Sequence, residues 1–176
     1  MEVNTKVNLS GLILDNPVIP ASGTFGFGKE YVDFYDINIL GSISIKGTTV
    51  QRRKGNPQPR IAECYSGLIN SVGLENPGME NVILKELKDL EKIYRKPVIA
   101  NISGFSVEEY VTLAREMDQV DNVGIIEVNI SCPNVDHGGL AFGTNANNVR
   151  ELTKKIKEVT TKPVYMKLSP NVTDIK

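Results

Sequence analysis

The stretch Arg95-Lys96-Pro97-Val98-Ile99-Ala100 has a second version further along the chain, Thr161-Lys162-Pro163-Val164-Tyr165-Met166. Each version follows a charged segment with helical spacing and passes through Lys-Pro-Val into a run of mostly apolar residues. Proline ends a helix because it has no backbone N–H to donate, and for the same reason it is best tolerated at the start of a strand. The two versions therefore predict two helix ends, each followed by a strand.

The same alternation of helix and strand extends in both directions from these stretches. Short runs rich in Val and Ile predict strands at residues 17–21, 40–46, 97–103, 124–130 and 163–168. Longer charged segments, whose apolar residues recur three and four positions apart, predict helices at residues 79–95, 106–120 and 145–160. The pattern is typical of an α/β protein built from βα units around a parallel sheet. We expect the apolar stripes of the helices to pack on the outside of that sheet.

Local signals support the starts of two of these helices. Ser106 with Glu109 three residues later is a capping box, in which the two side chains bond free backbone N–H groups reciprocally. Asn145 or Asn147 can cap the next helix, because an Asn side-chain oxygen accepts hydrogen bonds from its first free N–H groups. We therefore expect helices to begin at these positions.

Length and charge indicate a single globular domain over residues 1–176. Lys and Arg number 20 against 21 Asp and Glu, so no excess positive charge favours nucleic acid or an anionic membrane as a partner. Residues 1–10 lack the apolar core of a signal peptide, and no later run approaches the length of a membrane span. We therefore expect a soluble, cytoplasmic protein.

Polar side chains stand at the C-terminal ends of four predicted strands, although buried strands of a parallel sheet are normally apolar throughout. These residues are Lys46, Asn101, Asn129 and Lys167. A barrel or a doubly wound sheet gathers its ligand-binding groups at this edge. One such residue can simply cap a loop, but four in succession predict a ligand site.

The two cysteines, Cys64 and Cys132, lie in different predicted segments and lack C-x-x-C spacing, so we expect neither a disulfide framework nor a metal site. Cys64 is expected to be a small buried apolar residue, as most free cysteines are. Cys132 lies among loop residues before a Gly-rich stretch, where a thiol can face a ligand. A nucleophilic pair of Cys132 with His137 is a weaker alternative, because no third orienting group is evident.

Two further loops could contact a flat ligand. The stretch from Ser22 to Gly28 matches neither the dinucleotide-binding fingerprint nor the P-loop, but its glycines allow close approach of the backbone. The stretch from Asn70 to Gly78 precedes a predicted helix and contains Asn amides, which both donate and accept hydrogen bonds. On its own, this second stretch would be interpreted as a turn.

Taken in order, these motifs resemble class 1 dihydroorotate dehydrogenases over the whole chain. They are the segments 21–24, 44–49, 55–60, 70–78, 129–134 and 167–171. Cys132, at a position where the membrane-bound class 2 enzymes have Ser, favours class 1, and residues 7–31 and 136–139 favour class 1B. The resemblance implies a (β/α)8 TIM barrel. Because such a barrel needs about 250 residues, the chain is expected to be roughly its first half.

The resemblance implies an oxidoreductase of pyrimidine (UMP) biosynthesis that oxidises dihydroorotate to orotate, with FMN held at the C-terminal ends of the strands. On the matching position, Cys132 is the base that removes the C5 proton while hydride leaves C6 for the flavin. Another FMN barrel, such as a dihydropyrimidine or dihydrouridine reductase, is the enzymatic alternative. An inactive half barrel that serves only in folding or assembly is the non-enzymatic one.

The resemblance also implies two sets of binding residues. Those expected to contact the substrate are Lys46, Asn70, Ser71, Val72, Gly73, Leu74 and Asn129. Those expected to hold FMN are Ser22, Lys46, Gly47, Asn101, Asn129 and Lys167. Lys167 would lie near the flavin edge where negative charge accumulates on reduction, and an ammonium fixed there stabilises that charge.

For class 1B the resemblance implies a homodimer of barrels and a separate subunit that carries FAD and a 2Fe–2S cluster and passes electrons to NAD. This chain has too few cysteines to hold such a cluster itself. Fumarate is the alternative acceptor within class 1. The phosphate-binding loops of such barrels follow strands 7 and 8, beyond Lys176. We therefore expect the 176-residue chain alone to bind FMN weakly and to turn over little substrate.

Overall fold

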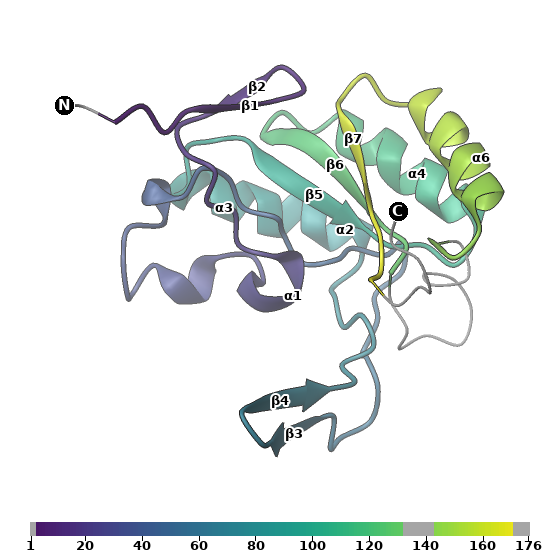
Figure 1. The fold of residues 1–176 in the computed structure, drawn as a ribbon, viewed down its shortest axis with the longest axis horizontal. Helices are drawn as coiled ribbons and strands as arrows, with labels where there is room; N and C mark the ends of the chain where they lie inside the picture. The colour runs from purple at the N-terminus through teal and green to yellow at the C-terminus, as the bar shows by residue number, and fades with distance from the viewer. Residues whose placement is uncertain (1–2, 132–142, 171–176) are drawn as a thin grey trace.

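The computed structural model of the chain describes residues 3–131 and 143–170. Its centre is a parallel sheet with the strand order β5 (Val98–Ile102), β6 (Val123–Asn129), β7 (Val164–Lys167). Figure 1 shows these strands crossing the middle of the molecule. As predicted, β5 and β7 start directly after Pro97 and Pro163, which precede the hydrogen-bonded ladder and need no N–H for it.

The segment 43–48 lies beside β5 and extends the parallel sheet. Its bridges pair Ser44 with Ile99 and Thr48 with Ile102. The predicted strand at residues 40–46 is therefore present only as isolated bridges, displaced toward the C-terminus. The parallel direction of these bridges agrees with the predicted succession of βα units.

The strand predicted at residues 17–21 does not form, so this prediction is wrong. The segment still follows the sheet, because the carbonyl of Val18 accepts a hydrogen bond from the N–H of Gly41 at 2.9 Å. Pro17 and Pro20 have no N–H to return, and the contact therefore cannot continue as a regular ladder.

All three predicted helices are present, and each ends earlier than predicted. The first is formed by α2 (Met79–Asn81), the π-helical segment η3 (Val82–Glu86) and α3 (Leu87–Ile93); the others are α4 (Val107–Asp118) and α6 (Ala146–Lys157). Helix α4 contacts β5, β6 and α6. Figure 1 shows α2, α3 and α4 behind the sheet, as expected for helices that cover the outside of a βα layer.

Both predicted helix caps are formed. The hydroxyl of Ser106 accepts a hydrogen bond from the N–H of Glu109 at 3.3 Å, and the Glu109 carboxylate accepts one from the N–H of Phe105 at 2.7 Å. The carboxylate thus reaches the residue before the cap. At the start of α6, Asn145 is the capping residue of the two alternatives, and it accepts from the N–H of Asn147 at 2.9 Å.

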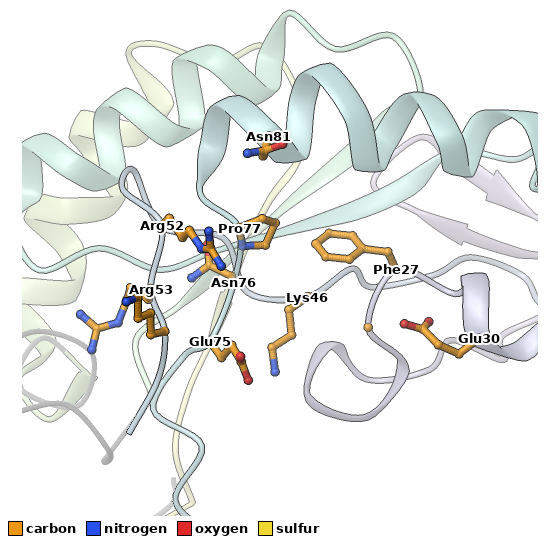
Figure 2. A pocket seen from close by; sticks show the side chains of 11 residues that line it. Phe27, Glu30, Lys46, Arg52, Arg53, Glu75, Asn76, Pro77 and Asn81 are labelled. Atoms are coloured by element: carbon orange, nitrogen blue, oxygen red, sulfur yellow. The ribbon is translucent and has the colours of Figure 1, made fainter. Parts of the chain in front are cut away.

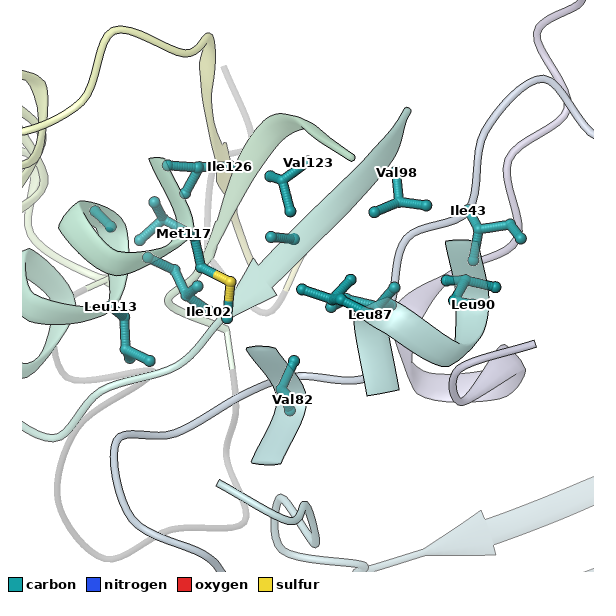
Figure 3. Close-up of a cluster of buried hydrophobic side chains, with 14 of the residues drawn as sticks. Ile43, Val82, Leu87, Leu90, Val98, Ile102, Leu113, Met117, Val123 and Ile126 are labelled. Atoms are coloured by element: carbon teal, nitrogen blue, oxygen red, sulfur yellow. The ribbon is translucent and has the colours of Figure 1, made fainter. Parts of the chain in front are cut away.

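The hydrophobic core lies between the sheet and the helices (Figure 3). Buried side chains of β5 and β6 meet those of α3 and α4 there, and they include Leu87, Leu90, Val98, Ile102, Leu113, Met117, Val123 and Ile126. Leu84, an apolar residue of the helix predicted at residues 79–95, is instead 60% exposed. It lies in the π-helical segment, whose wider turn rotates the residue away from the packed face.

Two antiparallel hairpins were not predicted. One pairs β1 (Val7–Leu9) with β2 (Leu12–Leu14), and the other pairs β3 (Ile61–Cys64) with β4 (Gly67–Asn70). Figure 1 shows the β3–β4 hairpin well away from the central sheet, and all its strand residues are exposed. Cys64 is therefore an exposed free thiol, and the prediction that it is buried is wrong, because nothing described packs over this hairpin.

Short helical turns occupy the region between the first hairpin and the sheet. They are α1 (Ser22–Phe25), η1 (Lys29–Tyr31) and η2 (Ile37–Ile39). The rings of Phe25 and Tyr31 stack with their centroids 4.2 Å apart, which holds α1 against η1. Within residues 3–131 and 143–170, no helix has the length and apolar character needed to cross a membrane.

Candidate active site

The polar strand ends predicted from the sequence lie at one edge of the sheet. The strand register sets Asn101 of β5 opposite Glu127 of β6, and Asn129 of β6 opposite Lys167 of β7. Because the strands are parallel, these positions are neighbours at the carboxyl ends of all three strands. This confirms the prediction that Asn101, Asn129 and Lys167 share one edge.

Asn129 and Lys167 are joined directly. The Nζ of Lys167 donates to Asn129 Oδ1 at 3.1 Å and to the hydroxyl of Ser131 at 2.9 Å. The Ser131 hydroxyl in turn donates to Asn129 Oδ1 at 2.7 Å, and the Asn129 Nδ2 donates to the hydroxyl of Ser103 at 3.1 Å. The ammonium, the amide and the two hydroxyls therefore form a single network that fixes the orientation of each group.

Gly47 brings the segment after residue 46 against the same network. A Cβ placed on Gly47 would lie 2.9 Å from Asn101 Oδ1, and 3.5 Å from both the Ser103 hydroxyl and Leu74 Cδ2. Only a residue without a side chain fits there without displacing Asn101. Three of the predicted binding positions, Gly47, Leu74 and Asn101, are therefore in close contact.

Asn101 is completely buried, and the two ends of its amide have different surroundings. The Nδ2 donates to the carboxylate of Glu127, whereas the Oδ1 has no hydrogen-bond donor among the described residues. Glu127 was missed in the sequence. The signal was available, because a carboxylate inside the apolar run of β6 is unusual for a buried parallel strand.

Lys46 lines a cavity of about 760 Å³ next to this edge (Figure 2). The cavity walls carry four cationic and two acidic side chains, from Lys46, Arg52, Arg53, Lys54, Glu30 and Glu75. The backbone N–H of Lys46 donates to the carbonyl of Gly26 at 2.8 Å, which joins the Gly-rich loop to this wall. The balance of charge around the cavity favours an anionic ligand.

The predicted substrate loop, residues 70–74, is fastened to the segment before it. Asn56 donates from its backbone N–H to the carbonyl of Val72 at 3.0 Å and from its side chain to the carbonyl of Ser71 at 2.8 Å. Gly73 has φ +73°, and a Cβ there would lie 2.7 Å from the Asn56 side chain. Gly73 is therefore required by both its backbone conformation and its close neighbour.

Arg53 holds the other side of this loop. Its Nε donates to the carbonyl of Gly73 at 3.4 Å, and its guanidinium lies over the ring of Phe105 at 4.7 Å from the ring centre. Such a cation–π contact connects the loop to the turn that follows β5. Leu74 reaches Gly47 from this loop, whereas Asn70 and Ser71 are exposed at its outer end.

The remaining predicted residues are placed differently. Ser22 is 6% exposed at the start of α1, on the Gly-rich segment that Gly26 joins to Lys46. Cys132, the predicted base, lies outside the described residues, as does His137. The structure therefore does not test the roles predicted for these two side chains.

The strand that carries Lys167 is anchored at its start by a charged group of α4. The Oδ1 of Asp118 accepts hydrogen bonds from the Thr160 hydroxyl at 2.6 Å, the Thr161 N–H at 2.8 Å and the Lys162 N–H at 3.3 Å. Burial alone would raise the pKa of Asp118, but these donors outweigh it and lower the pKa below its ordinary value of 3.8. Burial also lowers the pKa of Lys162, whose ammonium donates to two backbone carbonyls.

Comparison with known proteins gives the family. The family model described as dihydroorotate dehydrogenase matches residues 4–176. A relative from Bacillus cytotoxicus, named dihydroorotate dehydrogenase B (NAD(+)), catalytic subunit, is 56% identical over 170 residues, which cover 97% of this chain and 55% of the relative. A protein of the same name from Malacoplasma penetrans is 54% identical with the same coverage. The chain thus spans about half the length of the curated relatives it matches.

A solved structure supports the fold. The structure titled "Crystal structure of DHODH in complex with ferulenol from Eimeria tenella" matches 97% of this chain and 53% of its own, with a TM-score of 0.75 and 18% identity. At this identity the likeness concerns the fold alone, and it confirms the predicted part of a (β/α)8 barrel. The resemblance to class 1B is confirmed by the names of the relatives. Because the family model matches residues 4–176, the chain belongs to the dihydroorotate dehydrogenase family.

Proposed function

We propose that this chain supplies the flavin-facing and substrate-facing edge of an NAD-linked dihydroorotate dehydrogenase, an enzyme of pyrimidine biosynthesis. The observation that carries the proposal is the network at the carboxyl ends of β6 and β7, where Lys167 donates to Asn129 at 3.1 Å. An ammonium and an amide held in one network with Ser103, whose hydroxyl lies next to Gly47, suit a flat anionic cofactor. Such polar groups on rigid strands are the usual ligand-binding device of this fold.

The residues at this edge fit FMN on two counts. Asn101 Oδ1 is buried and receives no hydrogen bond from the described residues, so its capacity to accept a hydrogen bond is left for a ligand. Gly47 has no side chain at a position where a Cβ would lie 2.9 Å from Asn101 Oδ1. FMN would be held by Ser22, Lys46, Gly47, Asn101, Asn129 and Lys167, and when bound it supplies the acceptor for a hydride.

The substrate is proposed to be dihydroorotate, with orotate as product. Its ring alternates N–H and C=O groups. The exposed amide of Asn70 can answer both kinds, and the Asn129 Nδ2, which gives one hydrogen to Ser103, can donate its other to a ring carbonyl. Its carboxylate suits Lys46, which lines the mainly cationic cavity. The backbone of residues 71–74, held by Asn56, completes the proposed substrate wall.

Cys132 is proposed to act as the base for this substrate. The thiolate takes the proton from ring carbon C5 as C6 gives up its hydride, so that the two hydrogens leave as a proton and a hydride. Ser131 supports this placement, because its N–H and hydroxyl both bond Asn129 Oδ1 and thereby fix the chain directly before Cys132. A thiol is mostly protonated at neutral pH, so the rate should fall as the pH drops below the thiol pKa.

The proposal extends to partners and location. We infer a homodimer of barrels in the cytoplasm, with a separate subunit that carries FAD and a 2Fe–2S cluster and passes electrons to NAD. The name of the Bacillus and Malacoplasma relatives, each a catalytic subunit of an NAD(+) enzyme, supports the partner subunit and the NAD acceptor. Fumarate is the alternative acceptor within class 1, so the oxidation of dihydroorotate should be measured with NAD and with fumarate.

The test uses this chain alone and joined to the part of the Bacillus cytotoxicus relative that it does not cover. The joined protein is expected to carry bound FMN, to oxidise dihydroorotate, and to lose that activity in Cys132→Ala without losing its flavin absorbance. The 176-residue chain alone is expected to bind FMN weakly.

Oxidation of dihydrouracil in place of dihydroorotate would reassign the substrate. Flavin-free joined protein that is well folded by circular dichroism would overturn the proposed function. Tight stoichiometric FMN on the chain alone would contradict the expected need for the second half of the barrel.

A further inference from the structure

Three side chains meet at the sheet edge, the buried Ser44 and Asn101 and the part-buried Glu127, and neither Ser44 nor Glu127 has a role assigned so far. Glu127, on the middle strand β6, accepts hydrogen bonds at a single carboxylate oxygen, Oε2. One comes from the hydroxyl of Ser44 at 3.0 Å and the other from the Nδ2 of Asn101. The trio therefore joins three neighbouring segments of the parallel sheet, beneath the place where Gly47 approaches Asn101.

The chemistry of the carboxylate fixes the direction of the Asn101 amide. An ionised carboxylate only accepts hydrogen bonds, so the amide must turn its Nδ2 toward Glu127. Rotating the amide by half a turn would place Oδ1 against Oε2, two acceptors without a proton between them. The Oδ1 is thereby held on the opposite side, next to the α-carbon of Gly47.

The cost of this arrangement indicates a ligand. Asn101 is fully buried, and its Oδ1 has no donor among the described residues. A buried carbonyl oxygen without a partner costs about 1–3 kcal/mol, and buried polar groups are otherwise almost always bonded. Gly47 places no side chain of its own beside this oxygen, since a Cβ there would lie 2.9 Å from it.

We propose that Glu127 is a positioning residue that presents Asn101 Oδ1 as a fixed hydrogen-bond acceptor for an N–H or O–H group of the bound flavin. This inference rests on the proposed function, because it states that the flavin group in contact with Asn101 is a hydrogen-bond donor. Glu127 does not touch the ligand in this scheme. It acts by excluding the amide orientation that would offer the ligand a donor.

The decisive experiment exchanges the amide of Asn101 and the carboxylate of Glu127, singly and together, in the joined protein described above. In Asn101→Asp, two carboxylates face each other, and the FMN dissociation constant is expected to rise at least about tenfold, which corresponds to about 1.4 kcal/mol. In Glu127→Gln, the amide of Asn101 is free to adopt either orientation, and a smaller rise is expected. In the double variant, the amide introduced at position 127 donates to the new aspartate, whose second oxygen again accepts from the ligand.

The double variant Asn101→Asp/Glu127→Gln is therefore expected to bind FMN within about threefold of the parent protein, although each single variant binds more weakly. Fluorescence quenching of FMN gives the dissociation constants, and circular dichroism with thermal unfolding shows that each variant is folded. Glu116→Gln, which removes an exposed carboxylate of α4, is the matched control and should leave FMN binding unchanged.

Each outcome decides a separate question. If the parent binds no FMN, the proposed function and this inference both fail. If the parent binds FMN and both single variants equal it, or the folded double variant is as weak as Asn101→Asp, then only the role of Glu127 is overturned. A titration with lumiflavin, which lacks the ribityl chain, assigns the donor. If Asn101→Asp also weakens lumiflavin binding relative to the parent, the donor is a ring N–H. If it binds lumiflavin as the parent does, the donor is a ribityl O–H.

Discussion

The ammonium of Lys167 lies 3.1 Å from the side-chain oxygen of Asn129, across two parallel strands whose register sets these residues directly opposite each other. The contact fixes a positive charge at the carboxyl edge of the sheet without neutralising it, because an amide oxygen carries no net charge. The charge therefore remains available to an anionic ligand.

Lys167→Ala is expected to raise the FMN dissociation constant of the joined protein by at least about tenfold, since it removes a charge-assisted bond worth roughly 1.5–3 kcal/mol. A fluorescence titration measures the effect. Lys154→Ala, which removes an exposed lysine paired with Glu151 on α6, is the control and should bind FMN as the parent does. Equal affinities of the two variants would show that Lys167 does not contact the flavin.

Gly47→Ala is expected to destabilise the chain by about 1–3 kcal/mol, because the new methyl group would stand 2.9 Å from Asn101 Oδ1. Gly23→Ala is the matched control, since a Cβ there meets nothing within 4 Å and the residue lies in a helical turn. Urea denaturation of both variants gives the comparison. Similar free energies of unfolding would show that the contact at Gly47 relaxes without cost.

The stability of the chain is expected to fall in acid partly through Asp118. Its pKa in the folded protein is below the ordinary 3.8, because donors from the 160–162 loop outweigh the effect of burial. The ionised form therefore stabilises the fold fully above pH 3.8, and this contribution is lost as the pH falls through the lower folded-state pKa. Asp118→Asn should lower the free energy of unfolding at pH 7 and make it less dependent on pH below about 4. A parallel pH dependence in both proteins would contradict this.

Tyr110→Phe tests the link between α4 and the site strand. The Tyr110 hydroxyl donates to the carbonyl of Asn129 at 2.9 Å, and both residues are buried. Loss of this bond is expected to cost about 1 kcal/mol of unfolding free energy. Tyr65→Phe, at a fully exposed residue of the β3–β4 turn, should be neutral in the same urea titration. A neutral Tyr110→Phe would indicate that the carbonyl finds another donor.

Cys64→Ser is expected to change the free energy of unfolding by less than about 0.5 kcal/mol, as is usual for an exposed position. Cys64 is an exposed thiol on β3, so a thiol-reactive probe should label it in the folded chain. Strong destabilisation by the substitution, or slow labelling, would show that the hairpin is covered in solution.

The sequence alone determined the order of helices and strands in the second half of the described chain. Pro97 and Pro163 fix where β5 and β7 begin, and Ser106 and Asn145 fix where α4 and α6 begin, because each acts through its own backbone or its nearest neighbours. The strand-end residues followed from the same pattern, since all parallel strands end at one edge.

The hairpins were within reach of sequence reasoning but were missed. Ser10-Gly11 and Tyr65-Ser66 form the two-residue connections, and Ser10, Gly11 and Ser66 have positive φ values of 50°, 97° and 66°. Ser-Gly pairs between short apolar runs are a known turn signal. The strands they join are only three or four residues long, too short for a periodic pattern to reveal them.

Only the tertiary structure decided which polar groups meet. The contact of Gly47 with Asn101 and the bonds from Ser44 and Asn101 to Glu127 join residues far apart in the sequence. Strand order and register set these contacts, and a local pattern does not encode them. The sequence determines where each strand starts and ends because those signals act over a few residues. The polarity of the Asn101 amide depends on a carboxylate from another strand, and it is therefore a property of the fold.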